Sequence, residues 1–174
     1  MKNLFTLLLM SLISSVTFAQ FYTENWDNNG TWGMIDMDGV VDGWKPQDLS
    51  GEAAPYTALT NSMVSFSPSP LGPDHLLISP SIDISGMLGD MKMTYDIGAR
   101  DGAVVVPENY EIYIVTDTTN IAASLLSPTP IAPTVTGSVN TGNTIFNRTV
   151  DLTPFIGETE LFILFRHFNS ATGL

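Results

Sequence analysis

The chain has 174 residues, with 18 acidic side chains against 6 basic ones, a formal net charge of −12, and no cysteine. This acidic excess argues against nucleic acid and anionic membrane surfaces as partners, because their phosphates attract lysine and arginine. The length fits one domain with a sizeable core, and the absence of cysteine excludes a disulfide framework.

The N-terminus predicts a secretory signal peptide over residues 1–19. Met1–Asn3 carries one positive charge, residues 4–13 are mostly apolar, and Thr17–Ala19 places small residues at both positions that determine cleavage. The apolar run is shorter than the roughly 20 residues that cross a bilayer, so we expect cleavage before Gln20 and no membrane insertion afterwards. A secreted chain without cysteine favours a bacterial exporter.

The remaining chain shows the pattern of β-structure. Its 11 prolines and 14 glycines interrupt short runs of alternating apolar and polar residues, and sustained helical spacing is missing. In chain order, strands are predicted over 21–24, 56–66, 76–79, 82–84, 91–97, 110–116, 145–152 and 161–168. An acidic loop is expected over 30–43, one helical turn over 121–126, and a long connection with a weak edge strand over 127–144.

Two of these strands carry the most information about the layers. Met91, Met93 and Tyr95 alternate with polar residues, which indicates a strand with one buried and one solvated face. Residues 161–168 are apolar on both faces, which predicts a central strand covered on both sides. Together the elements predict an all-β sandwich or barrel.

The acidic loop is the strongest candidate for a chemical site. Asp36, Asp38 and Asp42 fall within seven residues, and glycine follows the last two. Such loops supply the carboxylate and carbonyl oxygens that calcium prefers, but an EF-hand starting at Asp36 fails, since Val41 stands where glycine is needed. A calcium site would therefore combine several segments, for example this loop with Glu24. Alternatively, the aspartates only cap turns.

The three tryptophans, Trp26, Trp32 and Trp44, allow two interpretations. An indole face can stack on a sugar ring, which would make a platform for carbohydrate. Alternatively, the indoles pack in the core and anchor the acidic loop that Trp32 and Trp44 bracket.

Catalysis has little support in the sequence. There is no cysteine and no Gly-x-Ser-x-Gly motif, and His75 and His167 are interpreted as structural or surface residues. Glycoside hydrolysis needs two carboxylates facing each other, and Asp36 and Asp38 have suitable spacing but lie beside glycine in an expected loop. We therefore expect a protein that is not an enzyme.

The order of several motifs resembles the cleaved-adhesin, or choice-of-anchor J, domains of Bacteroidetes surface proteins, which are related to the adhesin modules of gingipains. The similarity runs from about Phe21 to Gly173. The motifs are Phe21–Trp26, Gly30–Trp32, Ile35–Gly39, Trp44, Pro73–Asp83, Glu108–Tyr113, Val150–Leu152, Gly157 and Phe165–His167. Each motif is short, but their shared order is specific.

The resemblance implies a jelly-roll β-sandwich over residues 20–174, like carbohydrate-binding modules and galactose-binding-like domains. It also implies a non-catalytic adhesive role, a structural calcium ion and export by type IX secretion. The sequence departs from the family where Val40 and Val41 replace further acids. It also lacks the closing strand with its aspartate pair, so we expect a C-terminally truncated domain.

The leading expectation is an extracellular binding or adhesion module of a secreted or surface-anchored bacterial protein. Its partner would be a host or matrix protein or a glycan, and calcium would be held by Glu24, Asp36 and Asp38. The alternative is an accessory carbohydrate-binding module of a secreted hydrolase. A third hypothesis, a small hydrolase, would require two facing carboxylates.

Overall fold

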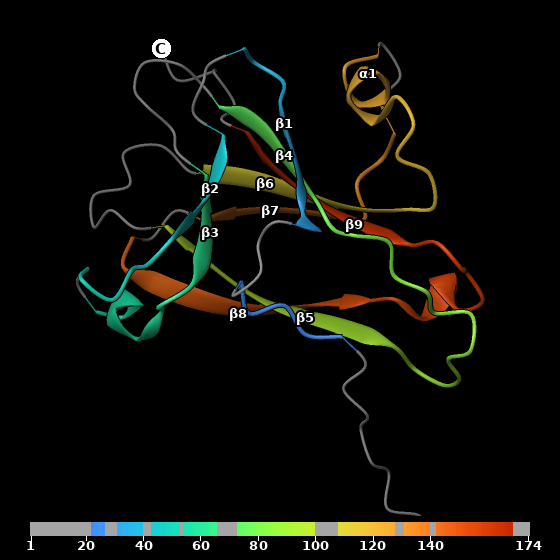
Figure 1. Cartoon of the computed structure of the whole chain (residues 1–174), viewed down its shortest axis with the longest axis horizontal. Helices are drawn as coiled ribbons and strands as arrows, with labels where there is room; N and C mark the ends of the chain where they lie inside the picture. Colours follow the sequence, from blue (N-terminus) through green and yellow to red (C-terminus); the bar gives the residue numbers. More distant parts are fainter. Residues whose placement is uncertain are drawn as a thin grey trace, which may run out of the picture.

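The computed structural model describes residues 22–26, 31–39, 43–52, 54–65, 73–99, 108–127, 131–139 and 142–168. The predicted signal peptide and residues 169–174, after which the chain was expected to be cut before a final strand, lie outside these ranges. Within them, no helix has the length and hydrophobicity to cross a bilayer. The elements (Figure 1) are β1 (Gly33–Asp36), β2 (Trp44–Gln47), η2 (Tyr56–Ala58), β3 (Ser62–Ser65), β4 (Asp74–Ile78), β5 (Lys92–Ala99), β6 (Glu108–Val115), α1 (Ile121–Leu125), β7 (Val135–Val139), β8 (Thr144–Asp151), η3 (Thr153–Phe155) and β9 (Phe162–Phe168).

The largest sheet has five strands in the order β1-β4-β9-β6-β7, and all its pairs are antiparallel. β9 is therefore central, which confirms the prediction from its two apolar faces. β7 lies at one edge, as the weak strand signal within 127–144 predicted. The single helical turn predicted over 121–126 is also confirmed, as α1.

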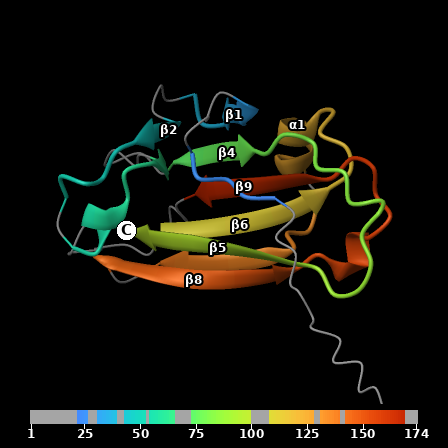
Figure 2. The same ribbon diagram turned by 60° about the horizontal axis from the view of Figure 1, so that its bottom comes forward.

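A second layer is formed by β5 and β8, which pair with each other and pack against the five-stranded sheet (Figure 2). Side chains of β5 alternate between exposed and half-buried, as the sequence of that strand predicts. The core between the layers contains buried residues of β6, β7, β8 and β9, namely Tyr110, Ile112, Ile114, Val139, Val150 and Ile163. The predicted all-β sandwich is thus confirmed.

The opposite face of the five-stranded sheet carries a smaller core. Ile121 and Leu125 of α1 pack there against Leu76 of β4, Tyr113 of β6 and Leu164 of β9. Because both faces of β4, β6 and β9 are covered, every residue of these strands is buried or half-buried.

The N-terminal half differs from the prediction in several places. Residues 22–25 form no strand, and within the described part of the predicted strand 56–66 the strand covers residues 62–65. Of the predicted strand 82–84, Ile82 alone pairs, in an isolated bridge with Leu161. The expected acidic loop contains β1, which ends at Asp36. A strand fits here because β1 is the edge of its sheet, where one face stays solvated and exposed polar side chains are tolerated.

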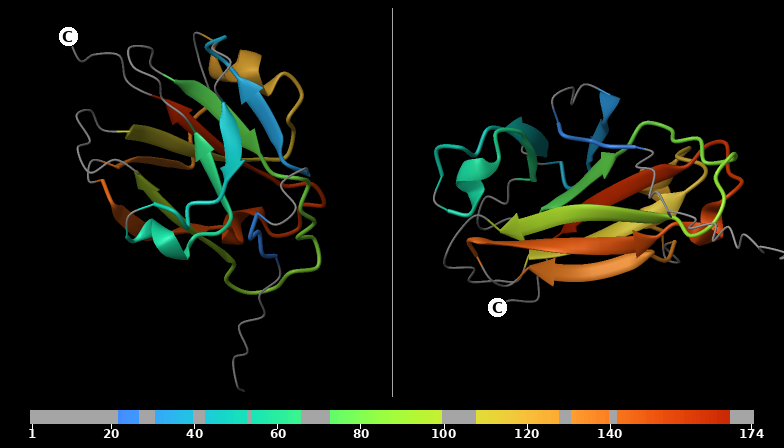
Figure 3. Two further views of the ribbon diagram at one scale, coloured as in Figure 1. Left: turned by 60° about the vertical axis from the view of Figure 1, so that its left-hand side comes forward. Right: turned by 90° about the horizontal axis from the view of Figure 1, so that it is seen from below.

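A hairpin of β2 and β3 stands apart from both sheets and lies beside β4 (Figure 3). Pro46 is tolerated in β2 because, among the described strands, β2 pairs with β3 alone, so that proline sits in an edge strand. The hairpin places Trp44 and Ser65 next to two histidines of the five-stranded sheet.

Candidate functional site

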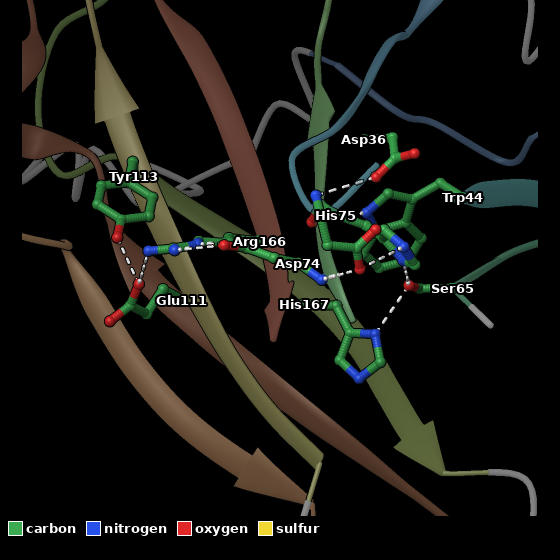
Figure 4. A network of polar contacts seen from close by, with 10 residues as sticks. Asp36, Trp44, Ser65, Asp74, His75, Glu111, Tyr113, Arg166 and His167 are labelled. Carbon is green, nitrogen blue, oxygen red and sulfur yellow. Dashed lines mark hydrogen bonds and ion pairs between the residues drawn. The ribbon is translucent and has the colours of Figure 1, made fainter. Parts of the chain in front are cut away.

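A row of polar side chains crosses the five-stranded sheet. The register pairs Asp36 of β1 with His75 of β4, and His75 with His167 of β9. Residues directly opposite each other in antiparallel strands point to the same face. The sheet therefore brings together three ionisable side chains that are far apart in the sequence (Figure 4).

Both histidines contact the hydroxyl of Ser65 in β3. Ser65 Oγ lies 2.9 Å from His75 Nδ1 and 2.7 Å from His167 Nδ1. The other ring nitrogen of His167, Nε2, lies 2.7 Å from a carboxylate oxygen of Glu108. Glu108, His167, Ser65 and His75 thus form one continuous chain of hydrogen bonds.

The histidine pair is buried beneath the β2–β3 hairpin. His75 is 1% exposed and His167 is 8% exposed. Trp44 donates from Nε1 to the backbone carbonyl of His75 at 3.2 Å, and its ring meets His167 edge-on. Burial lowers the pKa of His75; the nearby charge of Asp38 acts against this shift and His167 adds to it. His75 is therefore neutral at physiological pH.

The acidic loop after β1 folds back toward His75. One oxygen of Asp36, Oδ1, accepts hydrogen bonds from the backbone N–H groups of Asp38 (3.1 Å) and Gly39 (3.0 Å). Gly39 has a φ of 77°, which glycine adopts without strain. Asp38 Oδ2 accepts from the backbone N–H of Asp74 at 2.9 Å and lies 3.5 Å from His75 Nε2. Asp36 closes a turn, and the same turn presents both carboxylates to His75.

Two of the three predicted metal ligands come together here. Asp36, Asp38 and His75 each offer a ligand atom within 4.8 Å of the others, a separation that one metal ion could bridge. Glu24 belongs to a different group. Its carboxylate accepts hydrogen bonds from the Trp32 indole N–H (2.9 Å) and the Trp26 backbone N–H (2.7 Å). A calcium ion that adds Glu24 to the aspartates stays a prediction.

His75 was not predicted as a candidate ligand. Its only available signal was its position, directly before the apolar residues of β4 and after Asp74. Histidine in an apolar strand is usually structural, and the role of its neighbours depends on which strand lies opposite. The register of β1 on β4 shows which residues lie opposite His75, and this register cannot be read from the sequence.

A second polar cluster lies on the other face of the same strands, beside the smaller core (Figure 4). Arg166 contacts both oxygens of Asp74, through Nε at 2.7 Å and through a terminal nitrogen at 2.8 Å, and lies 3.4 Å from Glu111. The Tyr113 hydroxyl donates to Glu111. Burial, helped by this hydrogen bond, raises the pKa of Tyr113 to about 12. The hydrogen bonds to Asp74 raise the pKa of Arg166, which keeps it charged.

The three tryptophans are largely occupied by packing. Trp32 is buried, and its ring lies 4.9 Å from that of Trp26 at an angle of 53°. Trp26 and Trp44 are half-buried. These contacts give direct evidence that the indoles pack against the protein and anchor it, which is one of the two interpretations.

Comparisons with known proteins agree with this architecture. The family model described as "Cleaved Adhesin Domain" matches residues 18–173. Gingipain R1 and Lys-gingipain, both of Porphyromonas gingivalis, are each 29% identical to the chain over 162 residues. These alignments cover 85% of this chain but only 9% of each relative, so the chain spans a small part of those proteins.

Two solved structures of cleaved adhesin domains have a similar fold. The K1 cleaved adhesin domain of Lys-gingipain from Porphyromonas gingivalis W83 aligns with a TM-score of 0.58 at 25% identity, covering 80% of this chain and 81% of that domain. The K3 domain of the same protein aligns with a TM-score of 0.55 at 21% identity, over the same shares of the two chains. The family model covers nearly the whole chain, and this chain therefore belongs to the cleaved adhesin domain family.

Proposed function

We propose that this chain is a non-catalytic adhesion module of an exported bacterial protein, which binds a host or matrix protein or glycan. The observation that carries the proposal is the match of the family model across residues 18–173. The likeness to the K1 domain adds support, since it extends over four fifths of both chains. The predicted signal peptide supports an extracellular location.

The chain of hydrogen bonds through Ser65 raises the question of catalysis. A serine, a histidine and a carboxylate follow one another here at 2.7 Å, as they do in hydrolase triads. Ser65 Oγ is also engaged by His75, and both imidazoles are buried. A nucleophile must approach a substrate carbonyl, and a hydroxyl held between two buried rings is poorly placed to do so. These contacts favour a structural role for Ser65.

Binding is best tested with the full chain on immobilised extracellular-matrix proteins, measured by surface plasmon resonance, and on a glycan array. The proposal predicts saturable, salt-resistant binding to at least one protein or glycan. Glycan binding that is lost in both Trp26→Ala and Trp44→Ala would favour the accessory carbohydrate-binding module. Absence of saturable binding on both surfaces would contradict an adhesion module.

The proposal that the chain is not catalytic is tested in a separate assay. The full chain is incubated with activated esters, peptides and aryl glycosides, and product release is compared between the wild-type chain and Ser65→Ala. We expect no turnover above buffer in either protein. Ester hydrolysis that disappears in Ser65→Ala, while the variant keeps its thermal transition, would show that the hydrogen-bonded chain is catalytic.

A further inference from the structure

One buried nitrogen in the histidine pair lacks a hydrogen-bond partner. Within the described residues, His75 Nε2 is fully buried and makes no hydrogen bond, although the residue is 1% exposed and its other nitrogen contacts Ser65. Buried polar atoms in folded proteins almost always have a partner, so an exception needs an explanation. The atom faces the acidic loop, where Asp38 Oδ2 lies 3.5 Å away.

The hydrogen bonds on the far side of the ring determine where its proton resides. Glu108 is a carboxylate and can only accept, so a neutral His167 carries its proton on Nε2 and accepts at Nδ1 from the Ser65 hydroxyl. The Ser65 oxygen is then left to accept from His75, whose proton must lie on Nδ1. With His167 neutral, His75 Nε2 is an unprotonated lone pair.

A lone pair that faces carboxylate oxygens is repelled by them, and a cation between the nitrogen and the oxygens removes that repulsion. We propose that Asp36, Asp38 and His75 bind a divalent transition-metal ion of the zinc class, in a site completed by water. The site is distinct from the calcium site expected from the sequence, because its third ligand is a nitrogen from β4 and Glu24 takes no part in it.

The donor set distinguishes between metals. Calcium takes six to eight oxygens and is poorly served by imidazole, whereas nitrogen together with carboxylate oxygen suits zinc. Ligands about 2.0–2.1 Å from a tetrahedral zinc ion lie about 3.3–3.4 Å apart. The 3.5 Å between His75 Nε2 and Asp38 Oδ2 is close to that separation. Little rearrangement of these two atoms would be needed.

The groups around the three ligands also match a metal site. A metal-binding histidine usually donates its second N–H to a neighbour, and here Ser65 is placed to accept it. Asp38 Oδ2 is oriented by the backbone N–H of Asp74, and Asp36 Oδ1 by two N–H groups of its own turn. The carboxylates are thus held in position before any ion arrives, which reduces the entropy cost of binding.

The test uses the full chain after treatment with EDTA. Zn²⁺ binding is measured by isothermal titration calorimetry, Co²⁺ is used as a spectroscopic probe, and thermal unfolding is followed with Zn²⁺ or Ca²⁺. We expect one Zn²⁺ per chain, a higher melting temperature with Zn²⁺, and Co²⁺ absorption bands typical of mixed nitrogen and oxygen ligation. Asp36→Asn and His75→Asn should each weaken Zn²⁺ binding by at least about tenfold.

The Asp36→Asn variant is expected to fold, because Asp36 is exposed and asparagine can still accept the turn hydrogen bonds. Asp48→Asn is the matched control: Asp48 caps a similar exposed turn at Ser50 and should leave Zn²⁺ affinity unchanged. Equal Zn²⁺ affinity in Asp36→Asn and the wild-type chain would overturn the proposal. So would stabilisation by Ca²⁺ alone that requires Glu24 and persists in His75→Asn.

Discussion

At the residue scale, two faces of the same strands place histidine and arginine in different chemical environments. Alternation along β9 directs Arg166 to the side of the smaller core and His167 to the side of the hairpin. Arg166 is 16% exposed in its side chain and is satisfied by Asp74 and Glu111, so its charge is compensated. His75, one strand away, has a buried nitrogen that makes no hydrogen bond within the described residues.

Tyr113 allows this residue-level account to be tested by pH. Its pKa is raised from 10.0 to about 12, so the folded state binds this proton more tightly than the unfolded state. The resulting stabilisation is complete below about pH 10 and is lost as the pH rises toward 12. A two-unit shift corresponds to about 2–3 kcal/mol.

The experiment compares urea unfolding of the wild-type chain and Tyr113→Phe at pH 8, 9.5 and 11.5. Tyr113→Phe should be the less stable protein at pH 8 because it loses the hydrogen bond to Glu111. The gap between the two proteins should narrow by about 2 kcal/mol toward pH 11.5. All other tyrosines are common to both proteins, so free-energy curves that run parallel would contradict the account.

His75 also shows why the site could only be predicted in part. Asp36 and Asp38 were recognisable because two carboxylates next to glycine indicate a loop with oxygen ligands at any position in a fold. His75 contributes through the register of β1 on β4, which pairs it with Asp36 across 39 positions of sequence. Glu24 was predicted as a metal ligand because it is acidic, but in the structure its carboxylate accepts a hydrogen bond from the indole N–H of Trp32.

At the element scale, the long strands and the edge strand β7 were predictable, whereas β1 and β2 were not and β3 was predicted too long. β5, β6, β8 and β9 each have seven or eight residues whose apolar pattern matches the faces they bury. β1, β2 and β3 have four residues each, too few for a periodic pattern to emerge. They form because β4 and the hairpin partner offer free backbone groups, which is a tertiary effect.

The edge strand β7 depends on one glycine. Gly137 lies opposite Tyr110 of β6, and a Cβ atom at Gly137 would overlap the Tyr110 ring. Tyr110 is buried and contacts Tyr95 edge-on, so it has little room to move. Gly137→Ala should therefore destabilise the chain by about 1–3 kcal/mol in urea unfolding.

Gly86 provides the matched control for this substitution. A Cβ atom at Gly86 would meet no heavy atom within 4 Å, and the residue does not have a positive φ. Gly86→Ala should change the free energy of unfolding by no more than about 0.5 kcal/mol. Equal effects of the two substitutions would show that the close approach at Tyr110 does not constrain β7.

At the scale of the whole molecule, composition and pattern were enough for the fold class. The absence of sustained helical spacing and the frequent prolines and glycines indicated β-structure, and the family model matches residues 18–173. The way in which the β2–β3 hairpin lies over the sheet was beyond prediction, because Trp44 and Ser65 contact residues 10 to 102 positions away. The sandwich thereby assembles a polar site from segments that are separate in sequence.

The assembled site can be tested most directly by X-ray diffraction from crystals of the full chain grown with Zn²⁺, recorded on both sides of the zinc absorption edge. The account predicts one strong anomalous peak about 2.0–2.2 Å from His75 Nε2 and from a carboxylate oxygen of both Asp36 and Asp38. An empty position there, with His75 Nε2 donating a hydrogen bond to Asp38, would contradict it.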